Sequence, residues 1–344
     1  MISLIYGDVD NMNIEQIAKL AGVSKTTVSR VMNNKPDVNP ETKKKVLETI
    51  KQYKYQPNAF AKAISLQKSN NIGLIIPYEA DYIFANQFYV EVLRGVSTEL
   101  EKEGFNLQIC YPHDHNFVDI YKQKRVDGFI LMSPGSSQHF IVESLTELDA
   151  PFVSTAKIPS EKKMVYVDVD NYYGATLVLE YLLSLGHKKI GFIGKPYLTS
   201  GLDRLQGYKD TLEKKGIAFN ENLVKIAESG SIKGGAEAMF ELLEHNDSLT
   251  AVFCSNDLLA IGAISSIKQK GLKVPEDISV VGFDDIPLAK YMGPPLTTIR
   301  QPAYEKGIEA AKLVIRYLEK KKKPKSVILD IELIIRESTA QCKN

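Results

Sequence analysis

The stretch IEQIAKLAGVSKTTVSRVM, residues 14–32, decides the fold of the amino-terminal part of the chain. The apolar residues of its first half recur at helical spacing and share one face: Ile14, Ile17, Ala18 and Ala21. Gly22 follows, where a residue without a Cβ lets the chain turn, and Ser24 can cap a second helix. The inward positions of that second helix are Val28 and Val31. The stretch therefore predicts two short helices joined by a tight turn.

The outward face of the second predicted helix is short, polar and cationic, and it consists of Lys25, Thr26, Thr27, Ser29 and Arg30. Such a face suits the major groove of DNA, because arginine pairs with guanine edges and hydroxyl groups bond to bases or phosphates. An ordinary solvated helix carries similar residues, so the face alone leaves both interpretations open.

A third helix is predicted to begin at Asn39, which can act as its cap, with Pro40 at the first helical position. Its apolar side consists of Val46, Leu47, Ile50 and Tyr53. Three short helices then share one small core. The alanine-rich residues 59–66 predict about two further turns of helix. A helix this short is marginal alone in water, so we expect it to need a partner and DNA to form.

The charge of the chain is unevenly distributed, although the net value is only +1. Residues 12–70 carry a surplus of seven positive charges, whereas residues 71–344 carry a surplus of four negative ones. A basic block of this length suits a protein that binds the phosphate backbone, because neutralised phosphates release their counterions. A solvated basic face would look the same, so this evidence is weak by itself.

Three strings in this region carry a family resemblance: residues 17–24 (IAKLAGVS), residues 27–33 (TVSRVMN) and residues 55–58 (YQPN). Together they resemble the headpiece of the lactose-repressor/galactose-repressor (LacI/GalR) family. The resemblance implies that Lys25, Thr26, Ser29 and Arg30 face the groove of DNA and that Tyr55 contacts the backbone.

The resemblance also implies that residues 58–66 form a hinge helix, with Asn58, Ala61 and Ile64 among the residues that contact DNA. In the family, paired hinge helices enter the minor groove, and a leucine from each wedges between base pairs. Here that position is Ile64, whose branching at Cβ makes the wedge stiffer and blunter. We expect intercalation to persist with an altered depth or bend.

From residue 72 onward, buried-strand patterns alternate with amphipathic helices, which predicts parallel sheets. The predicted strands are 72–77, 107–111, 128–132, 190–194, 251–254 and 280–283, and the predicted helices are 88–103, 205–215 and 257–270. Two doubly wound lobes fit this length better than one sheet. Ligands of open α/β sheets bind beyond the carboxyl ends of the strands, so the residues that follow each strand are candidates for a site.

Those residues are polar or aromatic: Tyr78, Asn256, Asp257, Asp284 and Asp285. With Arg204 and the aromatic residues Phe88 and Phe283, they suit a polyhydroxylated ligand, whose hydroxyl groups need both donors and acceptors. A nucleoside could use the same set. Asp and Asn at these positions could instead be helix caps and turn formers.

The resemblance to the LacI/GalR family extends through most of the second part, in the strings LGH (185–187), RLQGY (204–208), CSND (254–257), VGFDD (281–285), PLTTI (295–299) and RES (336–338). These look like the family's regulatory domain, which is similar to periplasmic sugar-binding proteins. The resemblance implies that Arg204, Asn256 and Asp284 contact an effector and that Phe88 and Phe283 line its cleft.

Two features depart from the family near the expected ligand. The loop of residues 78–87 is longer than usual, and Tyr173 stands where some sugar-responsive members have an acidic residue. We include Tyr78 and Tyr173 among the expected effector-binding residues. The identity of the effector stays open.

The resemblance implies an all-α helix-turn-helix headpiece and an α/β, two-lobed regulatory domain of the periplasmic-binding-protein-like (type I) kind. We expect the headpiece over residues 12–57, the hinge over 58–70 and the regulatory domain over 71–341. One lobe is expected over about 71–185 and 302–330, and the other over about 186–301 and 331–341. Residues 1–11 precede the point where family members usually begin.

Several classes of function are disfavoured. Cys110, Cys254 and Cys342 are odd in number and far apart, which supports neither a disulfide framework nor a zinc site. No run of 18 uncharged apolar residues occurs, and residues 1–10 lack the features of an export signal, so we expect a cytoplasmic protein without a membrane partner. The His113-Asp114-His115 string lacks a third metal ligand nearby. No nucleophile–base motif supports catalysis, and no cofactor or metal is expected.

The sequence therefore predicts a regulator of transcription, not an enzyme, and more specifically a repressor. We expect a homodimer that binds palindromic double-stranded operator DNA and is controlled by a small molecule, a sugar or related metabolite. The alternative is a catabolite-control regulator that uses a phosphorylated carrier protein as corepressor. A sugar-binding transport component is disfavoured by the headpiece. Whether the effector releases or promotes DNA binding, and whether dimers form tetramers, stays open.

Overall fold

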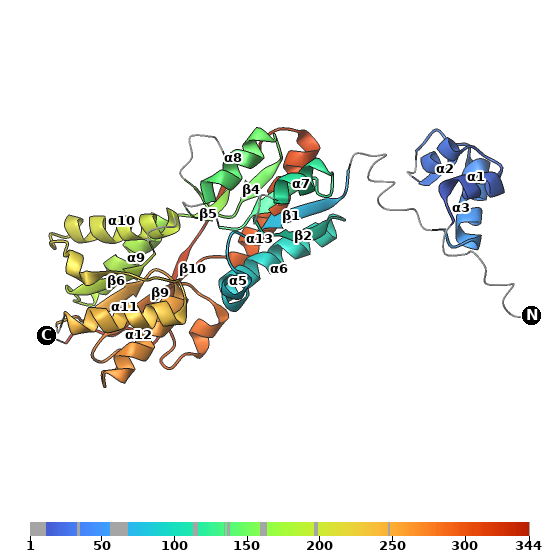
Figure 1. Ribbon diagram of the computed structural model, residues 1–344. Coiled ribbons are helices and arrows are strands. Elements are labelled where there is room, and N and C mark those ends of the chain that lie inside the picture. Colours follow the sequence, from blue (N-terminus) through green and yellow to red (C-terminus); the bar gives the residue numbers. More distant parts are fainter. Residues whose placement is uncertain are drawn as a thin grey trace, which may run out of the picture. The chain divides into compact units, whose positions relative to one another are not determined.

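The computed structural model describes residues 12–32, 35–55, 68–112, 116–133, 135, 138–158, 164–195, 199–246 and 248–343. The chain divides into two compact units, residues 1–69 and residues 70–344 (Figure 1). The predicted hinge contacts Asn58, Ala61 and Ile64, and the string from His113 to His115, lie outside the described residues.

The first unit contains helices α1 (Ile14–Ala21), α2 (Lys25–Met32) and α3 (Pro40–Gln52). Gly22 ends α1 with a φ of 63°, in the left-handed region that glycine adopts without penalty. The predicted cap of α2 is confirmed, because the Ser24 hydroxyl oxygen accepts a hydrogen bond of 3.0 Å from the backbone N–H of Thr27. Asn39 caps α3 in the same way at 2.9 Å, with Pro40 as the first helical residue. Local sequence therefore specifies where these helices begin and end.

The core of this unit consists of Ile17, Ala18, Ala21, Val28, Val31 and Val46. Ile50 and Tyr53 pack against it as predicted, but the prediction for Leu47 is wrong, since Leu47 is 46% exposed. Successive residues of an α-helix point about 100° apart, so an inward Val46 turns Leu47 towards solvent.

The first lobe of the second unit is built on a parallel four-stranded sheet in the order β2-β1-β3-β4. Its strands are β1 (Asn71–Ile75), β2 (Asn106–Cys110), β3 (Gly128–Leu131) and β4 (Phe152–Ser154). One face carries α6 (Gln87–Lys102) and α13 (Ala303–Lys320), which pack against each other. The other face carries α7 (Asn116–Lys122) and α8 (His139–Glu147). A short helix, α5 (Ala80–Ala85), lies between β1 and α6 in the chain.

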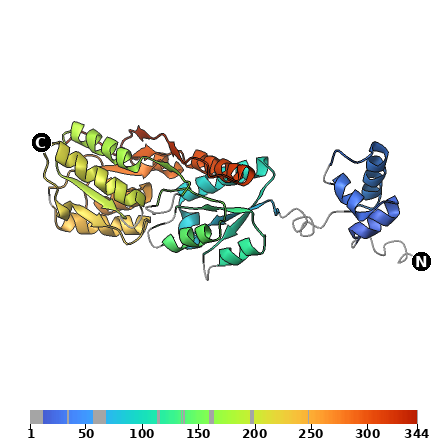
Figure 2. The same ribbon diagram turned by 90° about the horizontal axis from the view of Figure 1, so that it is seen from above.

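The second lobe is built on a six-stranded sheet in the order β12-β10-β9-β8-β6-β7, in which only β12 is antiparallel to its neighbour. Its strands are β6 (Ile190–Gly194), β7 (Val224–Ile226), β8 (Ala251–Cys254), β9 (Ser279–Asp284), β10 (Thr297–Arg300) and β12 (Glu332–Ile334). One face carries α9 (Asn171–Ser184) and α10 (Thr199–Lys214), and the other α11 (Ile232–Glu244) and α12 (Asp257–Gln269) (Figures 1 and 2). Two short 3-10 helices, η3 (Glu221–Leu223) and η4 (Pro287–Tyr291), complete this lobe.

The chain crosses between the lobes three times: between β4 and α9, between β10 and α13, and between α13 and β12. Two crossing segments pair as the parallel strands β5 (Val167–Val169) and β11 (Val327–Leu329). The expected lobe boundary near residue 185 placed α9 in the first lobe, yet Val178 and Leu182 of α9 pack in the core of the second lobe. The apolar pattern of a helix does not say which sheet it covers, so the sequence could not place this boundary.

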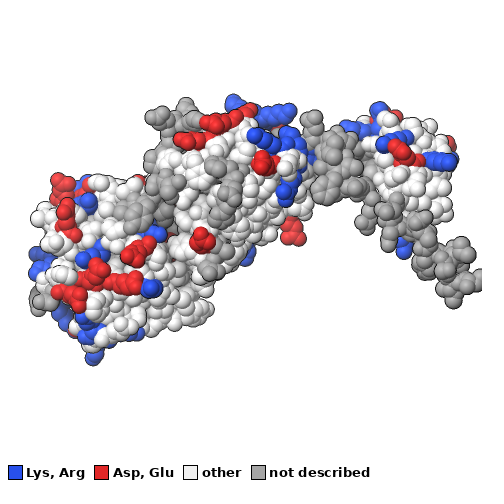
Figure 3. Space-filling view, in the orientation of Figure 1, with Lys and Arg blue, Asp and Glu red and all other residues white. Residues whose placement is uncertain are grey.

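Acidic and basic side chains are interspersed on the visible face of the second unit (Figure 3). In the described part of the chain, no helix has the length and apolar character needed to cross a membrane. No group of three or more potential metal-binding side chains occurs among those same residues.

Close packing of α11 on α12 depends on glycine at the crossing point. A Cβ on Gly262 would overlap the carbonyl oxygen of Ile232 and lie 2.6 Å from the backbone nitrogen of Ala236. A Cβ on Gly235 would overlap the backbone of Leu259 in the same way. Backbone atoms cannot rotate away as a side chain can, so the two helices are held at a distance that only glycine permits.

We expect Gly262→Ala to lower the free energy of unfolding of the second unit by about 1–3 kcal/mol, because the helices must separate to admit the methyl group. Urea denaturation of the purified chain, followed by circular dichroism, measures this. Gly293→Ala is the matched control, since a Cβ there has no neighbour within 4 Å. Equal losses in the two variants would contradict the steric explanation.

Candidate functional sites

The first candidate site is the outward face of α2 in the headpiece. Lys25, Thr26 and Arg30 are exposed, and Thr27 and Ser29 are half-buried. The Thr27 hydroxyl lies 2.9 Å from that of Ser24 and takes part in the helix cap. This leaves Lys25, Thr26 and Arg30 as the most accessible of the predicted groove-facing side chains.

Both cations of this face are paired with carboxylates of the headpiece itself. Lys25 Nζ lies 2.9 Å from Glu15 Oε1, and the Arg30 guanidinium contacts the Asp37 carboxylate. Exposed ion pairs contribute only about 0–1 kcal/mol, so a phosphate or a base edge can replace these partners at small cost. The ion pairs therefore fix the side chains on the outward face of α2 and still leave that face accessible to DNA.

Tyr55, the predicted backbone contact, follows α3 and is half-buried. Its backbone N–H donates a hydrogen bond of 3.0 Å to the carbonyl of Ile50, which fixes the residue against the end of the helix. Burial raises the pKa of the Tyr55 hydroxyl, so it stays protonated and able to donate a hydrogen bond.

The second candidate site is a cleft in the second unit, to which both lobes contribute. Phe88, Arg204, Asn256 and Asp284, all expected from the sequence, are among its lining residues. The other described lining residues are Tyr82, Asn86, Tyr89, Ser133, Ala156, Lys157, Asp168, Asn171, Lys195, Thr199, Ser200, Gly201, Ser255, Gln301 and Lys306.

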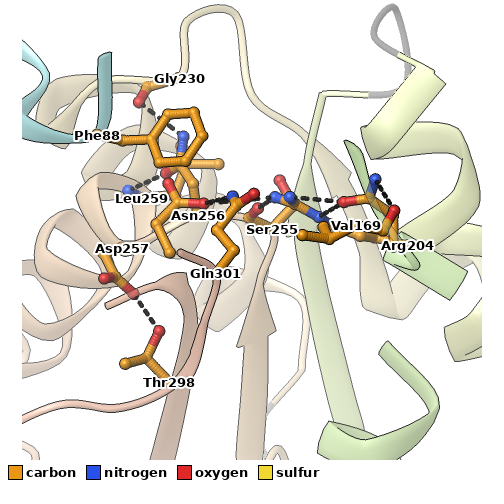
Figure 4. Close-up of polar contacts among 12 residues, drawn as sticks. Phe88, Val169, Arg204, Gly230, Ser255, Asn256, Asp257, Leu259, Thr298 and Gln301 are labelled. Carbon is orange, nitrogen blue, oxygen red and sulfur yellow. Dashed lines mark hydrogen bonds and ion pairs between the residues drawn. The ribbon is translucent and has the colours of Figure 1, made fainter. Parts of the chain in front are cut away.

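Arg204 lines the cleft and is only 7% exposed. Its guanidinium carbon lies 3.5 Å from the centroid of the Phe283 ring. Nε and Nη2 donate hydrogen bonds of 3.0 and 2.8 Å to Asn171 Oδ1, and Nη1 donates to the carbonyl of Ser255 (Figure 4). Asp284 Oδ1 lies 4.0 Å from Nη1 and supplies the nearest opposite charge. Stacking and hydrogen bonds together fix the plane of the guanidinium.

Hydrogen bonds and two ion pairs connect six buried side chains into a closed ring, which we call the cleft ring: Arg204, Asn171, Asp168, Lys306, Gln301 and Asp284. Lys306 Nζ donates to Asp168 Oδ1 at 3.0 Å and to Gln301 Oε1 at 3.3 Å. Gln301 Nε2 donates to Asp284 Oδ1 at 2.6 Å, and Asn171 Nδ2 donates to Asp168 Oδ1 at 3.4 Å. The positive charges of the two cations in the ring offset the negative charges of its two carboxylates.

The cleft ring joins elements of both lobes. Lys306 lies on α13 of the first lobe, whereas Arg204 on α10 and Asp284 at the end of β9 belong to the second. Asp168 and Gln301 lie on or beside segments that cross between the lobes. A change in the angle between the lobes therefore has to rearrange these contacts.

Asp284 sits in a strained position, with a φ of 125°. Burial raises the pKa of its carboxyl to about 6, although Arg204, Gln301 and Lys306 oppose that rise. Behind it, Asp257 accepts hydrogen bonds from the Thr298 hydroxyl at 2.5 Å and the Ile286 N–H at 2.8 Å. Burial also raises the pKa of Asp257 well above its ordinary value. The strand end is thus fixed by a buried acid that does not line the cleft.

Asn256 caps a helix, as one of its two interpretations from the sequence predicted, and it also lines the cleft. Its Oδ1 caps α12 by accepting a hydrogen bond of 2.8 Å from the Leu259 N–H. Its Nδ2 donates to the carbonyl of Gly230 at 3.1 Å (Figure 4). The residue lines the cleft while it holds the start of the helix.

Three tyrosines form an aromatic cluster beside the cleft: Tyr78 after β1, Tyr82 on α5 and Tyr89 on α6. Tyr78 donates a hydrogen bond of 2.7 Å from its hydroxyl to the carbonyl of Ser133 and does not line the cleft. Tyr82 lies at the lining and approaches the second lobe, where its ring centroid is 5.8 Å from Lys195 Nζ.

Three expected effector residues lie away from the cleft surface. Phe283 is fully buried beneath Arg204, and Tyr78 supports Tyr82. Tyr173 is 50% exposed on the first turn of α9 and does not line the cleft. The inward residue of that turn is Asn171, which is 3% exposed, so the side chain that meets Arg204 is two positions earlier than expected.

Sequence reasoning missed Asp168, Asn171, Lys195, Gln301 and Lys306. Gln301 directly follows β10 and Lys195 directly follows β6, so the rule on carboxyl ends of strands could have found both. Lys306 lies inside α13, where a lysine gives no sign of burial.

Comparison with known proteins agrees with this architecture. Residues 13–58 match the family "Bacterial regulatory proteins, lacI family", and residues 179–339 match "Periplasmic binding protein-like domain". The HTH-type transcriptional regulator DegA of Bacillus subtilis (strain 168) is 34% identical over 337 residues, covering 95% of this chain and 98% of that protein.

Solved structures of transcriptional regulators are also similar to this chain. The transcriptional regulator CelR–cellobiose complex is 30% identical with a TM-score of 0.74, covering 95% of this chain and 100% of that one. A LacI family transcriptional regulator from Enterococcus faecium with bound ribose is 30% identical with a TM-score of 0.70, covering 79% of this chain and 100% of that one. These relatives are regulators of transcription and not enzymes. The chain belongs to the lacI family of bacterial regulatory proteins and is a DNA-binding transcriptional regulator with a periplasmic-binding-protein-like domain.

Proposed function

We propose that this chain is a repressor whose affinity for a palindromic operator changes when a sugar or related metabolite binds in the cleft between the two lobes. The cleft ring carries this proposal, because it presents buried donors and acceptors at a place where both lobes meet. A ligand with several hydroxyl groups can exchange hydrogen bonds with Arg204, Asp284 and Asn256. Relatives solved with cellobiose and ribose support a sugar.

We propose that the chain acts as a homodimer, since a two-fold protein reads two half-sites of a palindrome. Four exposed apolar side chains that a partner could cover support this arrangement: Phe84, Val90, Leu288 and the 82% exposed Tyr291. The lobes are in contact close to two of them, since the backbone N–H of Leu288 in the second lobe donates a hydrogen bond of 3.0 Å to Gln87 Oε1 in the first. A partner bound at this contact would respond to the angle between the lobes.

Ligand and operator are then coupled through the angle between the lobes. A sugar that binds one arrangement of the cleft ring more tightly shifts the population of that arrangement, and the dimer transmits the shift to the hinge. A coupling free energy of ~1–3 kcal/mol would change operator affinity roughly 5- to 150-fold.

Fluorescence anisotropy with a palindromic operator library, at stated salt, tests the proposal. Sugars, nucleosides and a phosphorylated carrier protein are added in turn. A selective operator whose affinity is shifted by a sugar supports the proposal. A shift caused only by the phosphorylated carrier protein would favour the alternative of a protein corepressor. Absence of selective binding under every addition would refute both.

We expect Arg30→Ala to weaken operator binding about 10- to 100-fold, because a positioned arginine contributes about 1–3 kcal/mol of base discrimination. The anisotropy titration above measures it. Lys215→Ala is the charge-matched control, since Lys215 is exposed in the second unit. If both variants lose affinity equally, overall charge and not the position of Arg30 determines binding.

We expect Arg204→Lys to lower sugar affinity at least about 10-fold. A lysine keeps the charge but cannot reproduce the planar contacts with Asn171, Ser255 and Phe283. Isothermal titration calorimetry gives the affinity, and thermal melting confirms folding. The control is Arg316→Lys at an exposed position. Full sugar affinity in Arg204→Lys would place the ligand elsewhere.

We expect the affinity for a neutral sugar to fall about fourfold from pH 7.5 to pH 5.5, because Asp284, with a pKa of about 6, loses its charge over that range. The ionised carboxylate accepts hydrogen bonds from sugar hydroxyls, whereas the protonated form gives up part of that capacity. Calorimetry at both pH values measures the change, and an equal fall in Asp284→Asn would assign it to another group.

A further inference from the structure

Lysine occupies all but one of the positions 320–325 at the end of α13, and each of these side chains is exposed: Lys320, Lys321, Lys322, Lys323 and Lys325. The helix dipole stabilises cations in the last turn of a helix, and its effect falls off beyond that turn. α13 ends at Lys320, and Lys321 has a left-handed φ of 50°. The dipole therefore does not account for the lysines that follow the helix.

These lysines lie at the end of the first lobe that is remote from the cleft. Lys306, near the start of α13, lines the cleft. Val314 is already level with the amino end of β3, because a Cβ on Gly128, the first residue of that strand, would lie 3.4 Å from Val314 Cγ2. A helix advances about 1.5 Å per residue, so Lys320 lies beyond the amino ends of the strands.

A second basic segment lies at the same end of the lobe. It joins α7 to β3 and carries the exposed side chains of Lys122, Lys124 and Arg125. Burial raises the pKa of the Tyr317 hydroxyl, and Asp149 and Tyr121 raise it further, so the last turn of α13 lies near the end of α7. Residues 122–127 and 319–325 therefore form one surface, which we call the amino rim.

The amino rim is strongly cationic. Its two segments carry eight basic and two acidic residues. With Glu147 and Asp149 at the end of α8 included, a formal surplus of four positive charges remains. Figure 3 shows basic side chains gathered over α7 and the end of α13. The second unit as a whole has a surplus of negative charge, so this local concentration favours a polyanionic partner.

The chain that arrives from the headpiece enters the second unit at this rim. The backbone N–H of Asn70 donates a hydrogen bond of 2.8 Å to Asp127 Oδ2, and Asn71 Nδ2 donates one of 2.9 Å to the carbonyl of Arg125. Only residues 56–67 separate the described part of the headpiece from this attachment. A segment of that length spans at most about 40–45 Å, so DNA held by the headpiece stays within reach of the rim.

Building on the proposed binding of an operator by the headpiece, we propose that the amino rim is a second DNA-contacting surface, whose basic side chains bind phosphates of the same duplex. Lysine suits this role because its ammonium group is a point charge on a flexible stem. Phosphate contacts add affinity without reading the sequence. An acidic protein surface would match the charge as well, but DNA is the polyanion that this chain already holds beside the rim.

The salt dependence of DNA binding tests the proposal. Fluorescence anisotropy of the full chain gives the dissociation constant for a palindromic operator duplex and for a scrambled duplex, over about 0.1–0.3 M potassium chloride. Each lost phosphate contact lowers the slope of log affinity against log salt by about 0.9. We expect the combined change Lys320→Gln, Lys322→Gln and Lys325→Gln to lower that slope by at least about 1. Affinity should fall about 3- to 30-fold for both duplexes, so their ratio is retained.

Two further variants separate position from charge. The matched control changes three exposed lysines of the second lobe to glutamine: Lys188, Lys215 and Lys273. It removes the same charge and should leave the slope unchanged. Arginine at positions 320, 322 and 325 should retain the slope, and thermal melting confirms that each variant is folded. An unaltered slope in the rim variant, or equal losses in the rim variant and the control, would overturn the inference alone. Absence of selective operator binding by the unaltered chain would overturn the proposed function as well.

Discussion

Burial of the Arg204 guanidinium is the constraint on which the second unit depends. A charge removed from water costs several kcal/mol unless hydrogen bonds and an opposite charge replace the lost solvent. Here those replacements come from Asn171 at the start of α9, Ser255 after β8 and Asp284 at the end of β9, with Phe283 beneath the guanidinium plane. Because these partners come from three different elements, the arginine can be satisfied only when the start of α9 and the ends of β8 and β9 meet at one place.

The same constraint connects the two lobes. Asp284 is itself buried and strained, and it relies on Gln301, which in turn contacts Lys306 of the first lobe. A buried polar network is stable when every member has a partner and becomes costly when one is lost. A change in the angle between the lobes would therefore have to exchange one complete set of partners for another. Under the proposed function, these are the discrete arrangements between which a ligand would select.

Sequence reasoning succeeded where structure is local. The caps at Ser24 and Asn39 and the strands β6 and β8 were predicted at their observed positions, because caps depend on neighbouring residues and buried strands are short apolar runs. It failed where burial depends on distant parts of the chain. Tyr173 and Asn171 lie on the same helical turn, and only the position of Arg204 decides which of them faces the cleft. Lys306 can be buried in α13 because its ammonium group donates a hydrogen bond to the carboxylate of Asp168, which lies 138 residues away in the sequence.

This division explains why the kind of molecule was easier to infer than its ligand. The headpiece is a small local unit whose motif contains most of its own contacts, so its sequence reveals DNA binding directly. The cleft ring is assembled from separate segments, and the family resemblance marks only two of its members, Arg204 on α10 and Asp284 at the end of β9. The cleft also has lining residues outside the ring, among them Lys195 and Tyr82. They come from separate segments and follow no periodic pattern in the sequence. Because every lining side chain helps to determine which ligand fits, the sequence pattern alone does not identify that ligand.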